Sequence, residues 1–233
     1  MIEIRPSQER GRSRIDWLDA RHSFSFAHYF DPRWRGFGPL LVLNEDRIAP
    51  ASGFGPHSHR DMEIVTLPLA GALEHRDNTG QSGVLRPGVV QRMSAGTGIV
   101  HSEMNPSPDE LLHLLQIWIV PEREGLEPGY EEISLGQSDA AWVPVANRDG
   151  GEHCLRIHQD AALHLASIDA HASNARALDA SGQAWLQVIA GSGEVNGQIV
   201  SAGDGVAMVH EGELEVAAGD TGLEALLLEF FSP

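Results

Sequence analysis

Glycine and proline punctuate this chain at short intervals, and that spacing limits what it can fold into. The 233 residues include 25 Gly and 13 Pro. The segments between them are mostly apolar or alternating runs of about four to eight residues, which are typical of short β-strands. We therefore expect an all-β sandwich or barrel, with little helix. The predicted strands cover residues 40–43, 63–69, 71–76, 89–93, 111–120, 154–159, 185–189, 193–196, 206–209, 213–216 and 224–231.

The chain divides into two halves that resemble each other weakly. Residues 121–139 are acidic, contain Gly and Pro and lack an apolar period, which is typical of a boundary. A strand-like run ending in Ala-Gly, followed by a glycine turn, occurs at 63–71 and again at 183–191. This internal repeat predicts two small antiparallel β-barrels in tandem. The expected ranges are 1–125 for the N-terminal barrel, 126–140 for a linker and 141–233 for the C-terminal barrel.

Charge and composition exclude several classes of partner. The chain has 16 basic and 33 acidic residues, a net charge of −17, which repels nucleic-acid phosphates and anionic membranes. The N-terminus has no apolar signal region, and no segment reaches the roughly 18 apolar residues of a membrane span. The one cysteine, Cys154, excludes an intramolecular disulfide and suits a reducing compartment. We expect a cytoplasmic protein that binds neither nucleic acid nor membrane.

Two alternating segments carry potential metal ligands, His57-Ser58-His59 and His101-Ser102-Glu103. Side chains two residues apart on a strand project from the same face, so each segment can aim two ligands at one point. Three imidazoles and a carboxylate favour a divalent transition metal and leave coordination positions free for a reaction. By the same parity Glu63 and Asp61 also share the face of His57 and His59. The residues alone therefore leave the carboxylate open.

The second half has no equivalent of these ligands. Aligning the two repeats places apolar or unpaired side chains opposite all four positions. We therefore expect the C-terminal barrel to be metal-free. The aligned pairs are Ala177 with His57, Asp179 with His59, Val216 with His101 and Ala218 with Glu103.

These motifs, in order, resemble a known family. The segment 57–63 resembles the first motif of the cupin superfamily, and its combination with 93–103 is similar to the pirin family. The segments 22–32 and 112–119 also match pirins. The resemblance is strongest over residues 15–120 and weak after 140, and it implies a bicupin fold, two jelly-roll barrels with the metal in the first. The general cupin pattern takes its carboxylate from the first motif, which would be Glu63, whereas the pirin resemblance favours Glu103.

The resemblance also implies a function. Bacterial members of this type are associated with quercetin dioxygenase activity, and vertebrate pirins are iron-containing nuclear regulators of transcription. We therefore expect a metal-dependent dioxygenase that cleaves flavonol-type phenols with dioxygen and releases carbon monoxide. Glu103 would act as the general base as well as a ligand. The expected cofactor is one divalent metal, Fe(II) first, with Ni, Mn, Cu, Co or Zn also accepted by such ligands.

Two other functions are compatible with this sequence, of which the first uses the same four ligands and the second predicts a protein without metal. One is a metal-dependent regulatory protein that binds a protein partner without turnover, and the other is a bicupin that has become purely structural. An open cavity with apolar walls above the metal would favour the enzyme.

The remaining histidines are expected to have structural roles. His75 is predicted at a surface turn and His113 in the core or a pocket wall. His22 and His28 are predicted to pack in an aromatic segment whose Phe24 and Phe26 alternate like a strand. Five histidines of the second half show no ligand spacing and are expected to be non-catalytic, namely His153, His158, His164, His171 and His210.

Overall fold

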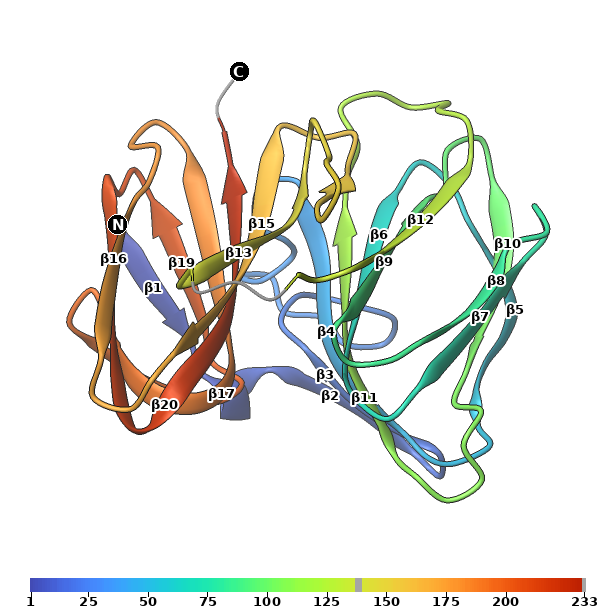
Figure 1. Cartoon of the computed structure of the whole chain (residues 1–233), viewed down its shortest axis with the longest axis horizontal. Helices are drawn as coiled ribbons and strands as arrows, with labels where there is room; N and C mark the ends of the chain where they lie inside the picture. The colour runs from blue at the N-terminus through green and yellow to red at the C-terminus, as the bar shows by residue number, and fades with distance from the viewer. Residues whose placement is uncertain (137–139, 232–233) are drawn as a thin grey trace. The chain divides into compact units, whose positions relative to one another are not determined.

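The chain folds almost entirely into antiparallel β-strands. The structure is a computed structural model, and it describes residues 1–136 and 140–231. Within these ranges the helical content is one 3-10 helix, η1 (Ser7–Glu9), and all strand pairs are antiparallel. The all-β prediction is confirmed (Figure 1). No helix in the described part of the chain is long and apolar enough to cross a membrane.

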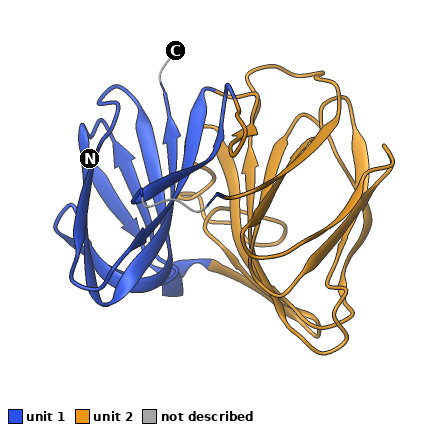
Figure 2. Ribbon diagram, viewed as in Figure 1, with its two compact units in different colours: residues 1–10, 136–149, 160–233 blue, residues 11–135, 150–159 orange. Residues whose placement is uncertain are grey.

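The strands form two compact units, and each unit combines segments that are far apart in sequence (Figure 2). Unit 1 comprises residues 1–10, 136–149 and 160–233, and unit 2 comprises residues 11–135 and 150–159. These ranges differ from the contiguous ones expected above, because short segments pair across them. β1 (Ile2–Arg5) pairs with β19 (Gly205–Val209) of unit 1, and β12 (Gly129–Ser134), inside the expected linker, pairs with β9 (Val89–Ser94) of unit 2.

All strands of unit 2 except the two-residue β14 belong to two sheets. The seven-stranded sheet has the order β12-β9-β6-β11-β4-β3-β2, and the four-stranded sheet has the order β5-β10-β7-β8. Leu73 and Leu85 of the small sheet pack with Leu112 and Leu114 of the large one, so the core lies between the sheets. The other strands of unit 2 are β2 (Gly11–Ile15), β3 (Leu18–His22), β4 (Leu40–Ile48), β5 (Gly53–His59), β6 (Glu63–Ala70), β7 (Leu73–Asp77), β8 (Ser82–Leu85), β10 (Ile99–Met104), β11 (Leu112–Ile119) and β14 (Leu155–Arg156).

Unit 1 is built around one sheet in which β1, β19, β17, β20, β15 and β13 follow in that order, with β16 paired to β20 and β18 to β17. The 18-residue β20 pairs with β16 through residues 213–217 and with β15 through residues 223–230. Its apolar residues join one core cluster with those of β17 and β19. The remaining strands are β13 (Trp142–Asn147), β15 (Ala161–Ile168), β16 (Ser173–Ala177), β17 (Gln183–Val195), β18 (Gln198–Ser201) and β20 (Glu213–Phe230).

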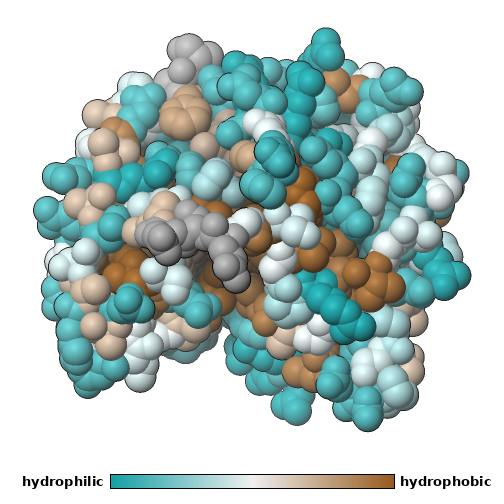
Figure 3. Space-filling view, in the orientation of Figure 1, coloured by the Kyte–Doolittle hydropathy of each residue, from teal (hydrophilic) through white to brown (hydrophobic). Residues whose placement is uncertain are grey.

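The structure corrects several predicted strands. Residues 185–189 and 193–195 belong to the single strand β17, and residues 213–216 and 224–230 to the single strand β20. Residues 154–159 contain only the two-residue β14. Phe24 and Phe26 follow β3 and lie outside any strand. Hydrophilic residues make up most of the face shown in Figure 3, with hydrophobic groups between them.

Candidate metal centre

Three histidines from two neighbouring strands converge inside unit 2. His57 and His59 lie on β5, and His101 lies on β10 directly opposite His57. The ring centroids are 4.4 Å apart for His57 and His101, 4.7 Å for His57 and His59, and 4.9 Å for His59 and His101. One nitrogen from each ring lies within 4.8 Å of the others. The alternation of His57 with His59 therefore places both rings next to His101, and the structure brings these three histidines together.

Two of these rings have a nitrogen free for a ligand. Nδ1 of His57 donates to the carbonyl of Gly55 at 2.9 Å, which leaves the lone pair on Nε2. Nε2 of His101 is buried and has no hydrogen-bond partner. A buried polar nitrogen without a partner is costly unless something binds it. The residues present therefore fit a metal ion.

Burial and neighbouring histidines keep two of the imidazoles, those of His59 and His101, uncharged. Burial, and then the neighbouring His57, lower the pKa of His59 to about 4. Burial, followed by the nearby histidines, lowers the pKa of His101 to about 3. Near neutral pH both rings are therefore deprotonated, which is the form that binds a metal.

Glu103 lies two residues beyond His101 on the same face of β10. Its side chain is buried, and both carboxylate oxygens accept hydrogen bonds from Nε2 of Gln116 on β11, at 2.8 and 3.1 Å. Burial raises the pKa of Glu103 despite this bond. Its carboxylate forms a second group of potential ligands with His101 and His75, also within 4.8 Å.

The alternative carboxylates point elsewhere. Glu63 accepts a hydrogen bond from Ser94 Oγ at 2.9 Å and lies 3.3 Å from Nδ1 of His158. Asp61 has a φ of 48° and accepts a hydrogen bond from the backbone N–H of Gly125 at 2.7 Å. The chain thus turns between β5 and β6, which enter different sheets, so strand parity does not continue from His59 to Glu63.

His75 is the site residue that the sequence reasoning missed. It was predicted at a surface turn, and this is wrong: His75 is fully buried on β7, directly opposite Glu103. Its Nε2 lies 3.1 Å from Oδ2 of Asp77. His75-Arg76-Asp77 is itself an alternating segment of the kind that identified the other ligands, and that was the signal available.

The other histidines of unit 2 take structural positions. His113 is half-buried and bonds through Nε2 to Glu45 at 2.9 Å, as expected for a hydrogen-bonded residue. His22 is buried and bonds to Asn44 at 2.8 Å. His28 is exposed, so the packing prediction is wrong for it.

Aromatic rings flank the histidine cluster on two sides. The ring of Trp118, on β11, lies edge-on to His59 at 4.8 Å. Phe54, near the start of β5, lies 6.3 Å from His57 and packs edge-on against Trp17 at 5.1 Å. The cluster therefore has apolar, aromatic surroundings next to its half-buried members.

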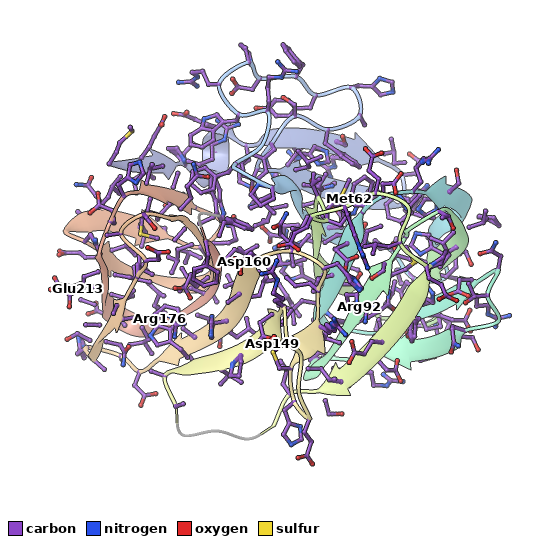
Figure 4. The ribbon with its side chains drawn as sticks, turned by 90° about the horizontal axis from the view of Figure 1, so that it is seen from above. Met62, Arg92, Asp149, Asp160, Arg176 and Glu213 are labelled. Carbon is purple, nitrogen blue, oxygen red and sulfur yellow. The ribbon has the colours of Figure 1, made fainter. Side chains whose placement is uncertain are left out.

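The matching strand pair of unit 1 holds different side chains in a different register. Val216 of β20 pairs with Asn174 of β16, and Ala177 pairs with Glu213, so Ala177 and Val216 are not cross-strand partners as His57 and His101 are. The two positions that the repeat alignment matched to His57 and His101 therefore do not face each other across this strand pair. Val216 packs in the core. Figure 4 labels Arg176 and Glu213 on these strands of unit 1, and Met62 and Arg92 in unit 2.

Comparisons with known proteins agree along the whole chain. Residues 3–119 match the Pirin family, and residues 144–230 match the family described as the quercetinase C-terminal cupin domain. The chain is 41% identical over 229 residues to a quercetin 2,3-dioxygenase of Escherichia coli K12, with 98% of each chain covered.

Solved structures give the same result. A bacterial pirin of Escherichia coli in complex with nickel(II) is 40% identical, with a TM-score of 0.94 and 99% of each chain covered. A quercetin 2,3-dioxygenase of Acinetobacter baumannii has a TM-score of 0.80 at 20% identity, over 98% of this chain and 78% of that one, and shares the fold. The predicted bicupin fold is confirmed. The chain belongs to the pirin family.

Proposed function

We propose that this protein is a metal-dependent dioxygenase that cleaves flavonol-type phenols such as quercetin. The observation that carries the proposal is the convergence of His57, His59 and His101 within unit 2, with the buried carboxylate of Glu103 beside His101. The E. coli relative named quercetin 2,3-dioxygenase and the nickel(II) complex of the E. coli pirin support it.

The proposed ligands are His57, His59, His101 and Glu103. His57 and His101 each have a free nitrogen, and Glu103 supplies an anionic oxygen beside His101. A bound divalent metal would lower the pKa of a coordinated phenol hydroxyl and hold the phenol close to dioxygen. We take Fe(II) as the first candidate, and Ni(II) as the second because of the nickel complex of the relative.

Glu103 is the proposed general base. Burial raises the pKa of its carboxyl group, so its carboxylate oxygen accepts a phenolic proton more readily than an exposed glutamate would. Gln116 holds both oxygens through one amide nitrogen and so fixes the direction of the carboxylate. Gln116 would thereby keep the base in place while it takes up and returns the proton.

The aromatic surroundings suit an aromatic substrate. Trp118 and Phe54 stand beside His59 and His57, the two half-buried histidines. Aromatic side chains favour stacked or edge-to-face contacts with other rings and exclude water. A planar phenol with an ionisable hydroxyl is therefore the substrate class that we propose.

The test couples metal analysis to turnover. The purified protein is analysed for metals, stripped and reconstituted separately with Fe, Ni, Mn, Cu, Co and Zn, and quercetin decay is followed in air and under nitrogen. We expect decay in air with at least one metal and none without dioxygen. Decay that continues unchanged under nitrogen contradicts a dioxygenase.

Two other outcomes distinguish the alternatives. A protein that binds metal but leaves quercetin intact in every form would instead be a regulatory protein whose metal state controls binding to a protein partner. A protein that holds no metal after growth in metal-replete medium would be a structural bicupin. A cytoplasmic location and the absence of nucleic-acid binding stay predictions.

A further inference from the structure

We propose that His75 and Asp77 form a positioning pair that sets the tautomer of His101 and so makes its Nε2 available to the metal. The inference rests on the proposed metal site. It concerns two residues of β7 that contact the site from the side opposite to β5. His75 and Asp77 are the cross-strand partners of Glu103 and His101, respectively.

The turn after β7 holds Asp77 in one orientation. Its Oδ1 accepts hydrogen bonds from the backbone N–H and the hydroxyl of Thr79, at 2.8 and 2.6 Å, and from the N–H of Gln81 at 3.1 Å. Burial raises the pKa of Asp77, but the bonds from Thr79 and His75 outweigh burial and lower the pKa overall. Oδ2 is thus a fixed, ionised acceptor facing His75.

The carboxylate then determines where the protons lie on both rings. Nε2 of His75 donates to Oδ2 of Asp77 at 3.1 Å, so in the neutral ring Nδ1 carries the lone pair. That nitrogen faces Nδ1 of His101 at 3.4 Å, and it can accept a proton only if His101 carries one there. Nε2 of His101 is then unprotonated, and it is the buried atom that has no partner.

The surroundings of His75 keep the ring in place. Tyr130, on β12, covers it at a centroid distance of 4.9 Å, and the amide nitrogen of Gln91 lies 3.5 Å from its Nδ1. The cross-strand partner of His75 on β8 is Gly83, where an added Cβ would come 3.0 Å from the hydroxyl of Tyr130. The ring is therefore enclosed on the sides away from the histidine cluster.

The Asp77→Asn variant reverses this chain of hydrogen bonds. The three donors on Oδ1 hold the amide oxygen in that position, so the new NH₂ group replaces Oδ2 and donates to Nε2 of His75. His75 must then carry its proton on Nδ1 and donate it to Nδ1 of His101. Because Nδ1 of His101 is then the acceptor, the single N–H proton of the neutral ring must lie on Nε2. A metal ion would have to displace that proton in order to bind.

The experiment measures metal affinity and tautomer separately. Ni²⁺ alone is titrated against a chromophoric chelator, and the ¹⁵N chemical shifts of His101 are recorded in the metal-free protein. We expect Asp77→Asn to weaken Ni²⁺ binding by about 10- to 100-fold, the usual cost of losing such a partner. The His101 signals should change from the Nδ1–H to the Nε2–H pattern.

A matched control separates this role from general structure. Glu45→Gln alters another carboxylate–histidine pair of unit 2, Glu45 with His113, on the face of β11 opposite to Gln116. It should change neither Ni²⁺ affinity nor the His101 tautomer. Unchanged affinity and an unchanged tautomer in folded Asp77→Asn overturn the inference.

A second variant covers the case in which Asp77→Asn does not fold. His75→Phe keeps a ring beside Tyr130 and removes both nitrogens, so Nδ1 of His101 loses its acceptor. It should also weaken Ni²⁺ binding, and wild-type affinity in this variant overturns the inference. If the unmodified protein itself binds no Ni²⁺ or other metal, the proposed function fails, whereas the tautomer measurement still tests the pair.

Discussion

Two buried glutamates, one in each unit, differ in the charge beside them. Glu229 of unit 1 accepts hydrogen bonds from Arg176 at 2.8 and 3.1 Å and lies 3.4 Å from Nδ1 of His164. Burial alone would raise its pKa, but the bonds from His164 and Arg176 outweigh burial and lower it. Glu103 of unit 2 accepts hydrogen bonds from the neutral amide of Gln116, and burial raises its pKa.

The two glutamates therefore differ in whether a positively charged group already lies beside the carboxylate. A buried carboxylate is tolerated when it is paired, and Arg176 already provides the charge that Glu229 needs. Glu103 stands beside His101, and in the proposed site a metal ion would supply the positive charge that arginine supplies to Glu229. Unit 1 thus contains a buried carboxylate that is already paired with an arginine, and unit 2 contains a buried carboxylate beside histidines that could share a metal ion with it.

The largest expected effect comes from removing the proposed ligand carboxylate. Glu103→Gln keeps the shape and removes the anionic oxygen, so metal affinity should fall by more than the roughly 100-fold that loss of a supporting residue can cost. Glu63→Gln is the matched control, because Glu63 bonds to Ser94 and should leave the metal content unchanged. Elemental analysis of both variants measures this. If only the Glu63 variant loses its metal, the assignment of Glu103 is wrong.

The choice between Glu103 and Glu63 also shows which part of the site can be predicted from sequence alone. The alternation of His57 with His59 was enough to place these two histidines on one face, because both lie within the single strand β5, whereas the assignment of Glu103 as a ligand stays a prediction. Parity could not reject Glu63, because the positive φ of Asp61 breaks the strand and sends Glu63 into another sheet. That turn leaves little trace in the residue types themselves.

Long-range pairing limits the prediction of the fold in the same way. The strand-rich, two-barrel plan follows from local patterns of glycine, proline and apolar runs. The pairing of β1 with β19 joins residues near the two ends of the chain, and no local pattern encodes it. His75 was misplaced for a related reason, since its burial depends on Tyr130 of β12, a strand predicted as linker.

The second prediction concerns the closed ion pair of unit 1. Arg176→Met leaves Glu229 buried without its arginine partner and should destabilise the protein by about 3 kcal/mol. The double variant Arg176→Met, Glu229→Leu removes both charges and should recover most of that loss. Urea unfolding measures both, and a double variant less stable than the single one contradicts the comparison. Metal content should stay that of the unmodified protein in any folded variant.

A third prediction separates the two glutamates by pH. The lowered pKa of Glu229 means that its contribution to stability is complete above the ordinary glutamate pKa of about 4.3 and is lost as the pH falls through the lowered value. The raised pKa of Glu103 has the opposite sign: in the metal-free protein its contribution becomes more favourable as the pH falls from the raised value toward the ordinary one.

Unfolding at a series of pH values compares the metal-free protein with Glu229→Gln and Glu103→Gln. The stability advantage of the unmodified protein over Glu229→Gln should shrink below about pH 4.3. The stability of the unmodified protein relative to Glu103→Gln should instead increase as the pH falls from the raised pKa of Glu103 toward about 4.3. Two curves that change in the same direction would contradict the difference between the two sites.

The smallest expected effect tests the enclosure of His75. In Gly83→Ala the added methyl meets the hydroxyl of Tyr130 and the carboxylate of Glu132, each at 3.0 Å, and both are ends of side chains that can shift. The cost should be about 1 kcal/mol or less, with a small loss of Ni²⁺ affinity because Tyr130 also covers His75. Gly212→Ala in unit 1 is the matched control, since its methyl would meet Ala180 at an ordinary 3.8 Å. Equal Ni²⁺ affinity in the two variants would mean that Tyr130 covers His75 without holding it.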